Sequence, residues 1–260
     1  MNTTWSAAPV RYPPLAAFGE LLRTEWLLVF RQRKGLVAGL ALPLLLLVIF
    51  GSIPVFGKPE KVLDGFTYLD AYLPVLVAMS MSNLGLIGMP GQLAGYREAG
   101  ILRRLSTTPL PPSWVLGAQL IINVCVGAVS ILIVLILGVV AFSLRMPQNP
   151  GAFVLSSLLT IAAVFTLGLW IAAVARSSKE ASWISGGLFY PLMFFAGLWL
   201  PQPVMPAVLR HVSDYTPLGA SVQAIQSAVL GPFPPASALL VMAAYAAVFG
   251  ILAVRSFKWE

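Results

Sequence analysis

The chain has 260 residues, of which 58% are hydrophobic and only 10% are charged, and its formal net charge is +7. A soluble domain typically carries about 25% charged residues, so this chain has too few polar side chains to cover a surface that faces water. The composition therefore predicts a membrane protein, and it excludes a soluble enzyme, a disulfide-rich secreted scaffold and a disordered segment. The chain holds one cysteine, Cys125, and one histidine, His211, which excludes an intrachain disulfide and any site that needs two of either residue.

Residues 1–34 precede the first apolar stretch and are expected to form a separate cytoplasmic segment. Five apolar residues recur there at three- and four-residue steps, namely Leu15, Phe18, Leu22, Trp26 and Val29. This spacing predicts an amphipathic helix that lies in the cytoplasmic membrane interface and leads into the first span. A short soluble helix packed on other loops is the alternative. The segment is too charged at its end, and too long before the apolar run, for a cleaved signal peptide.

Residues 35–260 contain six intervals without Asp, Glu, Lys or Arg that are long enough to cross a membrane. A helix needs about 20 apolar residues to cross about 30 Å of hydrocarbon. The six intervals are roughly 35–53, 71–93, 114–144, 152–175, 181–200 and 236–254. The sequence therefore predicts an all-α membrane protein with six transmembrane helices in one domain, and both termini on one side of the membrane.

The lysine and arginine residues are distributed unequally between the two sides of these spans. Of the 16, 12 lie before span one, between spans two and three, between spans four and five, or after span six. The other four are Lys58, Lys61, Arg145 and Arg210. Because the basic excess lies in the cytoplasm, we expect a multi-pass protein of the bacterial inner membrane with both termini inside. Basic residues beside anionic lipid account for the net charge without nucleic acid as a partner.

The segment between spans two and three, residues 95–112, combines charges with a short apolar pattern. Ile101, Leu102 and Leu105 can share one helical face, and the prolines from Pro109 onward end any helix before span three. A short charged helix across the base of two spans suits contact with a cytoplasmic partner. A basic loop anchored to lipid headgroups fits the same composition equally well.

The external segment between spans five and six, residues 201–235, is 35 residues long and contains only two charged side chains, Arg210 and Asp214. So long and apolar a loop is not expected to lie in water. Helix-like stretches at 204–212 and 218–230 are expected to dip into the outer leaflet. A surface cap that only shields the bundle is the alternative.

Both segments resemble those of one known family. The run from Tyr96 to Leu105, followed by Thr108-Pro109-Leu110, resembles the signature between spans two and three of type-2 ATP-binding-cassette (ABC) permeases. It is most similar to the branch of daunorubicin-resistance-type drug and lipid exporters. The external Tyr215-Thr216-Pro217-Leu218 is similar to the family's usual Asn-Pro-Leu, with Thr216 where Asn is common. The resemblance extends over essentially the whole chain.

The resemblance implies a permease subunit for efflux of an amphiphilic drug, including an antibiotic, or of a lipid or metabolite. Its implied partners are two copies of an ABC ATPase subunit and a second permease copy or a paralogue. ATP and magnesium would be bound by the ATPase, so this chain would have no cofactor, metal or catalytic residue of its own. The segment after span two would be a coupling helix that contacts the ATPase through Arg97, Glu98, Ile101, Leu102, Arg103, Arg104 and Leu105. The external stretches at 204–212 and 218–230 would be re-entrant helices that form an external gate, with Pro217 and Leu218 as its candidate residues.

Spans two and five are rich in small, polar and proline residues, which favour close helix packing and bends. Flexible methionines and flat aromatic rings suit a path that accepts varied apolar molecules. We take Met79, Asn83, Phe194 and Phe195 as candidates for the translocation path, because an amide such as that of Asn83 is costly to expose to lipid. Simple packing between helices is the alternative for all four.

Several functions are argued against by motifs that the sequence lacks. The chain has no Gly-x-x-x-x-Gly-Lys-[Ser/Thr] loop, so any ATP must be hydrolysed by another subunit. Its only histidine lies outside the spans, which leaves an intramembrane serine hydrolase without a base. The loop of importer-type permeases needs a glycine where this chain has Arg104. A secondary transporter would carry membrane-embedded carboxylates, which the predicted spans lack. ATP-independent secondary transport and export of polysaccharide or lipid-linked glycan are the alternative functions.

Overall fold

A computed structural model describes residues 14–31, 33–58, 66–100 and 113–256, and these residues form helices and turns without a β-strand. The longer helices are α1 (Pro14–Arg31), α2 (Arg33–Ser52), α3 (Tyr68–Ser82), α4 (Met89–Glu98), α6 (Ser113–Phe142), α7 (Pro150–Val174), α8 (Ser178–Phe195), α10 (Pro217–Leu230) and α11 (Ala236–Ser256). A π-helical segment, η2 (Asn83–Gly88), joins α3 to α4, and a short 3₁₀ turn, η3 (Gln202–Val204), precedes α9 (Ala207–Asp214). The predicted all-helical fold is confirmed over the described residues.

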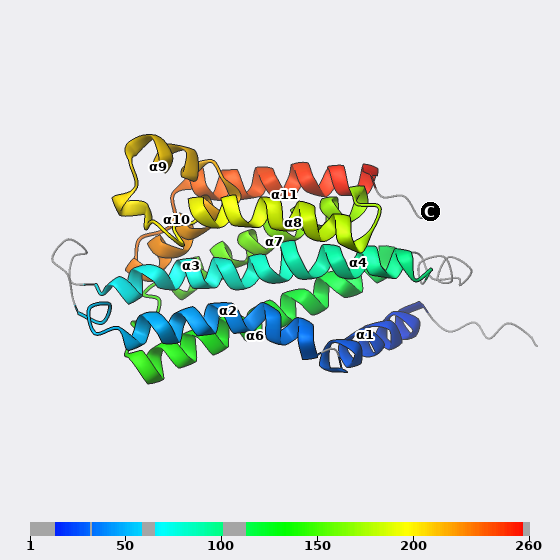
Figure 1. Cartoon of the computed structure of the whole chain (residues 1–260), viewed down its shortest axis with the longest axis horizontal. Coiled ribbons are helices and arrows are strands. Elements are labelled where there is room, and N and C mark those ends of the chain that lie inside the picture. Colours follow the sequence, from blue (N-terminus) through cyan, green and yellow to red (C-terminus); the bar gives the residue numbers. More distant parts are fainter. Residues whose placement is uncertain (1–13, 32, 59–65, 101–112, 257–260) are drawn as a thin grey trace, which may run out of the picture.

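The long helices α2, α3–α4, α6, α7, α8 and α11 lie side by side along the long axis of the molecule (Figure 1). The last turn of α4 and the C-terminal end of α11 lie at the same end of this bundle as α1, and α9 lies at the opposite end (Figure 1). Arg97 and Arg255 therefore share one end of the bundle. This arrangement agrees with the predicted grouping of basic residues, in which the segments beside α4 and after α11 lie on one side.

Among the described residues, four helices are long and apolar enough to cross a membrane, namely Tyr68–Glu98 (the continuous helix α3–η2–α4), Gly117–Phe142, Pro150–Val174 and Ala236–Ser256. They cover four of the six predicted spans. Helices α2 and α8 lie over the other two. However, the described apolar part of α2, Leu40–Ser52, is shorter, and α8 has charged residues in its first turn. Six spans, and an interfacial position for α1, therefore stay predictions.

Helix α8 ends at Phe195, five residues before residue 200, the approximate end of the fifth predicted span. Gly197 adopts a left-handed conformation, with φ +94°. Its N–H donates to Phe194 O at 3.0 Å, and the N–H of Leu198 donates to Met193 O at 3.1 Å. These two bonds form a Schellman motif, which satisfies the last carbonyls of the helix and turns the chain. Apolarity alone did not reveal this end, because the residues after Gly197 are also apolar.

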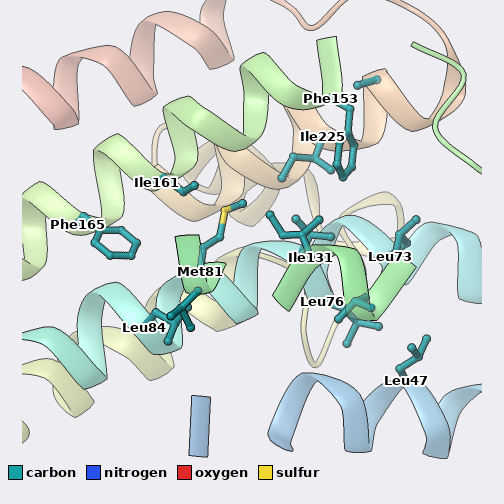
Figure 2. Close-up of a cluster of buried hydrophobic side chains, with 14 of the residues drawn as sticks. Leu47, Leu73, Leu76, Met81, Leu84, Ile131, Phe153, Ile161, Phe165 and Ile225 are labelled. Carbon is teal, nitrogen blue, oxygen red and sulfur yellow. The ribbon is translucent and has the colours of Figure 1, made fainter. Parts of the chain in front are cut away.

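The centre of the bundle is a cluster of buried aliphatic and aromatic side chains from α2, α3, η2, α6, α7 and α10 (Figure 2). It includes Leu47, Leu76, Met81, Ile131, Phe165 and Ile225. Lipid tails are as apolar as these residues, so packing contacts rather than exclusion of water hold such helices together. Shape therefore decides which helices meet.

Two glycines set the closest approach in this core, where α7 crosses the η2 segment. A β-carbon added at Gly168 would overlap the carbonyl oxygen of Gly85, and one added at Gly85 would lie 2.8 Å from Val164 Cγ1. Only hydrogen fits at either position, so the two backbones can touch. Small residues serve this purpose in membrane helices generally.

We predict that Gly168→Ala destabilises the protein by about 1–3 kcal/mol, because the added methyl group must push the η2 backbone away. Unfolding of the purified chain in detergent, by heat or denaturant, measures this cost. Gly250→Ala on α11 is the matched control, since its β-carbon would meet Thr166 Cγ2 at an ordinary 3.6 Å. Equal stability losses in the two variants would contradict the proposed role of the glycine contact.

Candidate functional site

The predicted site residues fall into three regions of the structure. One is the end of α4, where Arg97 and Glu98 lie. The second is a cavity beside Met79, and the third is the pair of helices α9 and α10, which contains Pro217 and Leu218. The other predicted coupling residues, Ile101, Leu102, Arg103, Arg104 and Leu105, lie outside the described residues.

Arg97 and Glu98 form the last turn of α4 and bond to the turn between α7 and α8. The guanidinium nitrogen Nη1 of Arg97 donates to Ala175 O at 2.8 Å. The carboxylate of Glu98 accepts two hydrogen bonds from Ser178, from the backbone N–H at 2.9 Å and from Oγ at 2.8 Å. The resemblance implied that both residues belong to a coupling helix and contact the ATPase. The structure places them in the last turn of α4, where both bond within the chain, and the ATPase contact stays a prediction.

The receiving turn is built from local capping interactions. Ser177 is the N-cap of α8, and its Oγ accepts from the N–H of Glu180 at 3.1 Å. The carboxylate of Glu180 accepts from the N–H of Arg176 at 2.8 Å. The Ser177-Ser178-Lys179-Glu180 sequence has the Ser-x-x-Glu spacing of a capping box, so this helix start was readable in the sequence. The sequence did not reveal that Glu98 of α4 bonds to Ser178 in this turn.

Small residues allow α4 and α8 to approach each other beneath these bonds. Ala94, Ala175 and Ala181 form a buried cluster with Ile184 packed against it. A β-carbon added at Gly95 of α4 would lie 3.4 Å from Ser178 Oγ of α8. The junction of α4, α7 and α8 therefore combines close packing with charge-assisted hydrogen bonds, of which the Arg97 bond is partly buried and the two Glu98 bonds are exposed to solvent.

Helix α6 also bonds to the last turns of α4. The Tyr96 hydroxyl accepts hydrogen bonds from Gln92 Nε2 at 3.2 Å and from Gln119 Nε2 at 3.4 Å. Gln119 is almost fully buried. A buried amide in an apolar helix needs such a partner, since an unmatched polar group costs free energy in lipid. Sequence reasoning missed Gln119, although it is the first amide side chain of the third predicted span and was a visible signal.

An apolar cavity of about 260 Å³ lies between α2, α3 and α8. Its walls are Leu42, Leu46, Phe50, Met79, Phe189, Tyr190, Leu198 and Trp199. No side chain in this lining carries a formal charge at neutral pH. The cavity thus has the character of a binding site for apolar groups, although it is smaller than the pockets of about 300–1,000 Å³ that hold whole drug-sized molecules.

Of the four predicted path residues, only Met79 lines this cavity. The amide nitrogen of Asn83 donates to Met79 O of its own helix at 3.2 Å, so one of its donors is bonded without a neighbouring helix or a bound molecule. The rings of Phe194 and Phe195 contact each other edge to face, with centroids 5.5 Å apart. Sequence reasoning missed the contribution of α2, because its leucines look like ordinary lipid-facing residues.

The two predicted external helices correspond to α9 and α10, which form a bonded outer corner with the end of α8. Ser213 Oγ donates to Phe195 O at 2.6 Å and accepts from Gln202 Nε2 at 2.9 Å. Thr216 caps α10, since its Oγ1 accepts from the N–H of Gly219 at 3.0 Å. Threonine is a good N-cap residue, so Thr216 does here what asparagine can do at the same position.

Helix α10 enters the bundle and packs against α3, α7, α8 and α11. Pro217 and Leu218, the candidate gate residues, open this helix and are buried, Leu218 completely. Leu218 belongs to the same buried cluster as Met79 and Phe189, which line the cavity. The start of α10 is thus packed beside the cavity. The predicted gating role itself is not tested by this arrangement.

The described residues contain no group of three or more His, Cys, Asp or Glu side chains that could hold a metal ion. The buried carboxylate of Asp70 has a structural role at the start of α3. It accepts from the N–H and Oγ1 of Thr67, at 3.0 and 2.8 Å, and from the N–H of Arg145 at 3.1 Å. These bonds cap the helix and fasten the turn before α7 to it.

Comparison with known proteins agrees with this membrane architecture. The profile of a family described as ABC-2 type transporter matches residues 16–230, which run from α1 to the end of α10. The chain is 22% identical over 228 residues to "Putative transport permease YvfS" of Bacillus subtilis (strain 168), covering 86% of this chain and 90% of that protein. It is 24% identical over 208 residues to "Putative transport permease ycf38" of Porphyra purpurea, covering 79% of this chain and 71% of that protein.

Proposed function

The chain belongs to the ABC-2 type transporter family, and from this premise we propose that it is the permease subunit of an exporter for amphiphilic molecules. A multi-pass membrane protein is supported directly by four helices of sufficient length and apolarity. In the proposed complex, two copies of this chain, or one copy and a paralogue, join two ABC ATPase subunits. The ATPases bind ATP and magnesium and supply the energy.

The observation that carries the proposal is one continuous helix, Tyr68–Glu98, which connects the cavity with the proposed cytoplasmic end. Met79 lines the cavity, and Glu98 lies 19 residues further along the helix. At 1.5 Å per residue this separation is roughly 28 Å, close to the thickness of the hydrocarbon core. Residues 101–112 follow this helix directly, so a partner bound there can act on the cavity through α4 and α3.

The lining of the cavity supports a neutral or weakly cationic amphiphile as cargo. An anionic headgroup or a glycan would lose hydration against such walls without gaining partners. An apolar tail or ring gains dispersion contacts, and a cation gains attraction to the faces of Tyr190 and Trp199. Drug-like and lipid-like molecules are therefore favoured over polysaccharide.

The proposed orientation places α1 and the end of α11 in the cytoplasm, because the basic excess lies beside them. We predict that a cysteine at Lys58 reacts with an impermeant maleimide added to intact cells, whereas one at Arg255 reacts only after permeabilisation. Both side chains are exposed, and Cys125→Ser removes the native thiol. The opposite labelling pattern would overturn the proposed topology.

Reconstitution into vesicles tests the proposed function. We expect no ATP turnover from the purified chain alone, and ATP-driven movement of a fluorescent cationic amphiphile when its ABC ATPase is present. An ATPase with its phosphate-loop lysine replaced is the control. ATP turnover by the chain alone, or transport driven by an ion gradient without the ATPase, would contradict the proposal, and the second result would favour a secondary transporter.

Filling the cavity tests the proposed path. Leu46→Trp adds an indole to its wall, and we expect transport in the complex to fall about tenfold while ATP turnover persists, since bound cargo would lose its space. Leu45→Trp is the matched control, because the neighbouring Leu45 is 55% exposed on the outside of α2. Unchanged transport by Leu46→Trp, or preferred export of anionic compounds in a panel of matched amphiphiles, would count against this path.

A further inference from the structure

We propose that Arg97 and Glu98 are positioning residues that fasten the end of α4 to the α7–α8 turn, so that a movement imposed on α4 carries α8 with it. The resemblance assigned both residues to contact with the ATPase, whereas this inference gives them a role inside the chain. It rests on the proposed function, because it concerns how movement at the ATPase-facing end reaches the cavity.

The charges of the two residues match the helix ends that they contact. Arg97 bonds to the carbonyl of Ala175, which caps the C-terminal end of α7, where unpaired carbonyls and the helix dipole attract a cation. Glu98 bonds to Ser178, the first residue of α8, where free N–H groups and the dipole attract an anion. Two adjacent and opposite charges on α4 therefore bind two adjacent and opposite helix ends.

Both oxygens of the Glu98 carboxylate are engaged by Ser178, Oε1 by the N–H and Oε2 by Oγ. Such paired, charge-assisted bonds fix orientation as well as distance. Ala94 of α4 and Ala181 of α8 also pack together in one buried cluster. These contacts join the end of α4 to the start of α8, with the Glu98 carboxylate itself exposed to solvent.

The cavity lies on the same two helices at a distance from this junction. Phe189 and Tyr190 of α8, and Met79 of the α3–η2–α4 helix, face one another across it. Phe189 lies 11 residues after Ser178, or roughly 16 Å along α8. If the junction holds, a displacement at the end of α4 moves both the α3 wall and the α8 wall of the cavity. If the junction does not hold, the same displacement moves the α3 wall more than the α8 wall.

A disulfide assay measures this junction without requiring transport. The β-carbon of a cysteine at Gly95 would lie 3.4 Å from the position of Ser178 Oγ, so the pair Gly95→Cys and Ser178→Cys is within reach of disulfide geometry. Ser178→Cys removes the Oγ bond to Glu98 but keeps the bond from the backbone N–H, so the assay reports on the latter. In a Cys125→Ser background and in native membranes, we expect Glu98→Ala to slow oxidation of this pair about tenfold. Glu180→Ala is the matched control, expected to stay within about twofold, because Glu180 bonds only within its own turn in the structure.

Transport by the complex with its ATPase gives the second readout. We expect Glu98→Ala to lower cargo moved per ATP about tenfold while ATP turnover is retained, and Glu98→Gln, which keeps one acceptor oxygen, to lose less. Oxidising the cysteine pair in the Glu98→Ala variant should restore transport, because a covalent bond then replaces the lost hydrogen bonds. Reduction should abolish the rescue.

Several results would overturn the inference. Equal oxidation rates with and without Glu98 would show that the residue does not hold the junction. Failure of the disulfide to rescue Glu98→Ala would assign Glu98 to another contact, such as the ATPase. Loss of transport on cross-linking an otherwise wild-type chain would show that α4 and α8 must separate. Failure of the proposed function can be told apart from failure of this inference. If the complex shows no ATP-driven transport, the proposed function fails, and the oxidation rates still measure whether Glu98 holds the junction.

Discussion

Hydrocarbon cannot hydrogen-bond, and this constraint shapes the rest of the structure. Each backbone amide at membrane depth must find its partner within the protein, so the chain forms long uncharged helices and keeps its charges at their ends. Several polar side chains inside the helices obey the same rule. Ser80, Thr160 and Ser221 each donate to the carbonyl four residues earlier in their own helix. Thr160 and Ser221 also reach Met242 Sδ of α11. The buried hydroxyls of Ser130, Ser156, Ser157 and Ser185, in contrast, have no hydrogen-bond partner among the described residues.

This constraint divides the bundle into a middle held by shape and two ends held by polar bonds. In the middle, the approach of Gly85 to Gly168 relies on the absence of side-chain atoms. At one end, the charges of Arg97 and Glu98 bind the α7–α8 turn, and at the other, Ser213 joins α8 to α9 and α10. The middle has few directional bonds between helices, such as those from Thr160 and Ser221 to Met242 Sδ, so its packing depends mainly on shape. At the ends, directional bonds specify which helix ends meet.

The sequence predicted the parts of this fold that depend on apolarity and charge. Uncharged intervals located six long helices to within a few residues at most ends, and the low charge of residues 201–235 indicated helices α9 and α10. It failed where a local geometry decided the outcome. The end of α8 depends on the left-handed conformation of Gly197, and the environment of Glu98 depends on a residue 80 positions away. The cavity could not be predicted from the sequence, because the α2 leucines that line it are the same residue type as the α2 leucines that are exposed on the outside of the bundle.

The π-helical segment Asn83–Gly88 has a consequence for how this long helix tolerates a change in its length. A π turn accommodates one residue more than an α turn, and each residue of an α-helix advances about 100° around the axis. Loss of one residue from this segment can therefore be absorbed by a change from a π turn to an α turn, which leaves Arg97 and Glu98 directed at the ends of α7 and α8. Loss of one residue from α4 itself has no such outlet, and it would rotate both side chains by about a quarter of a turn.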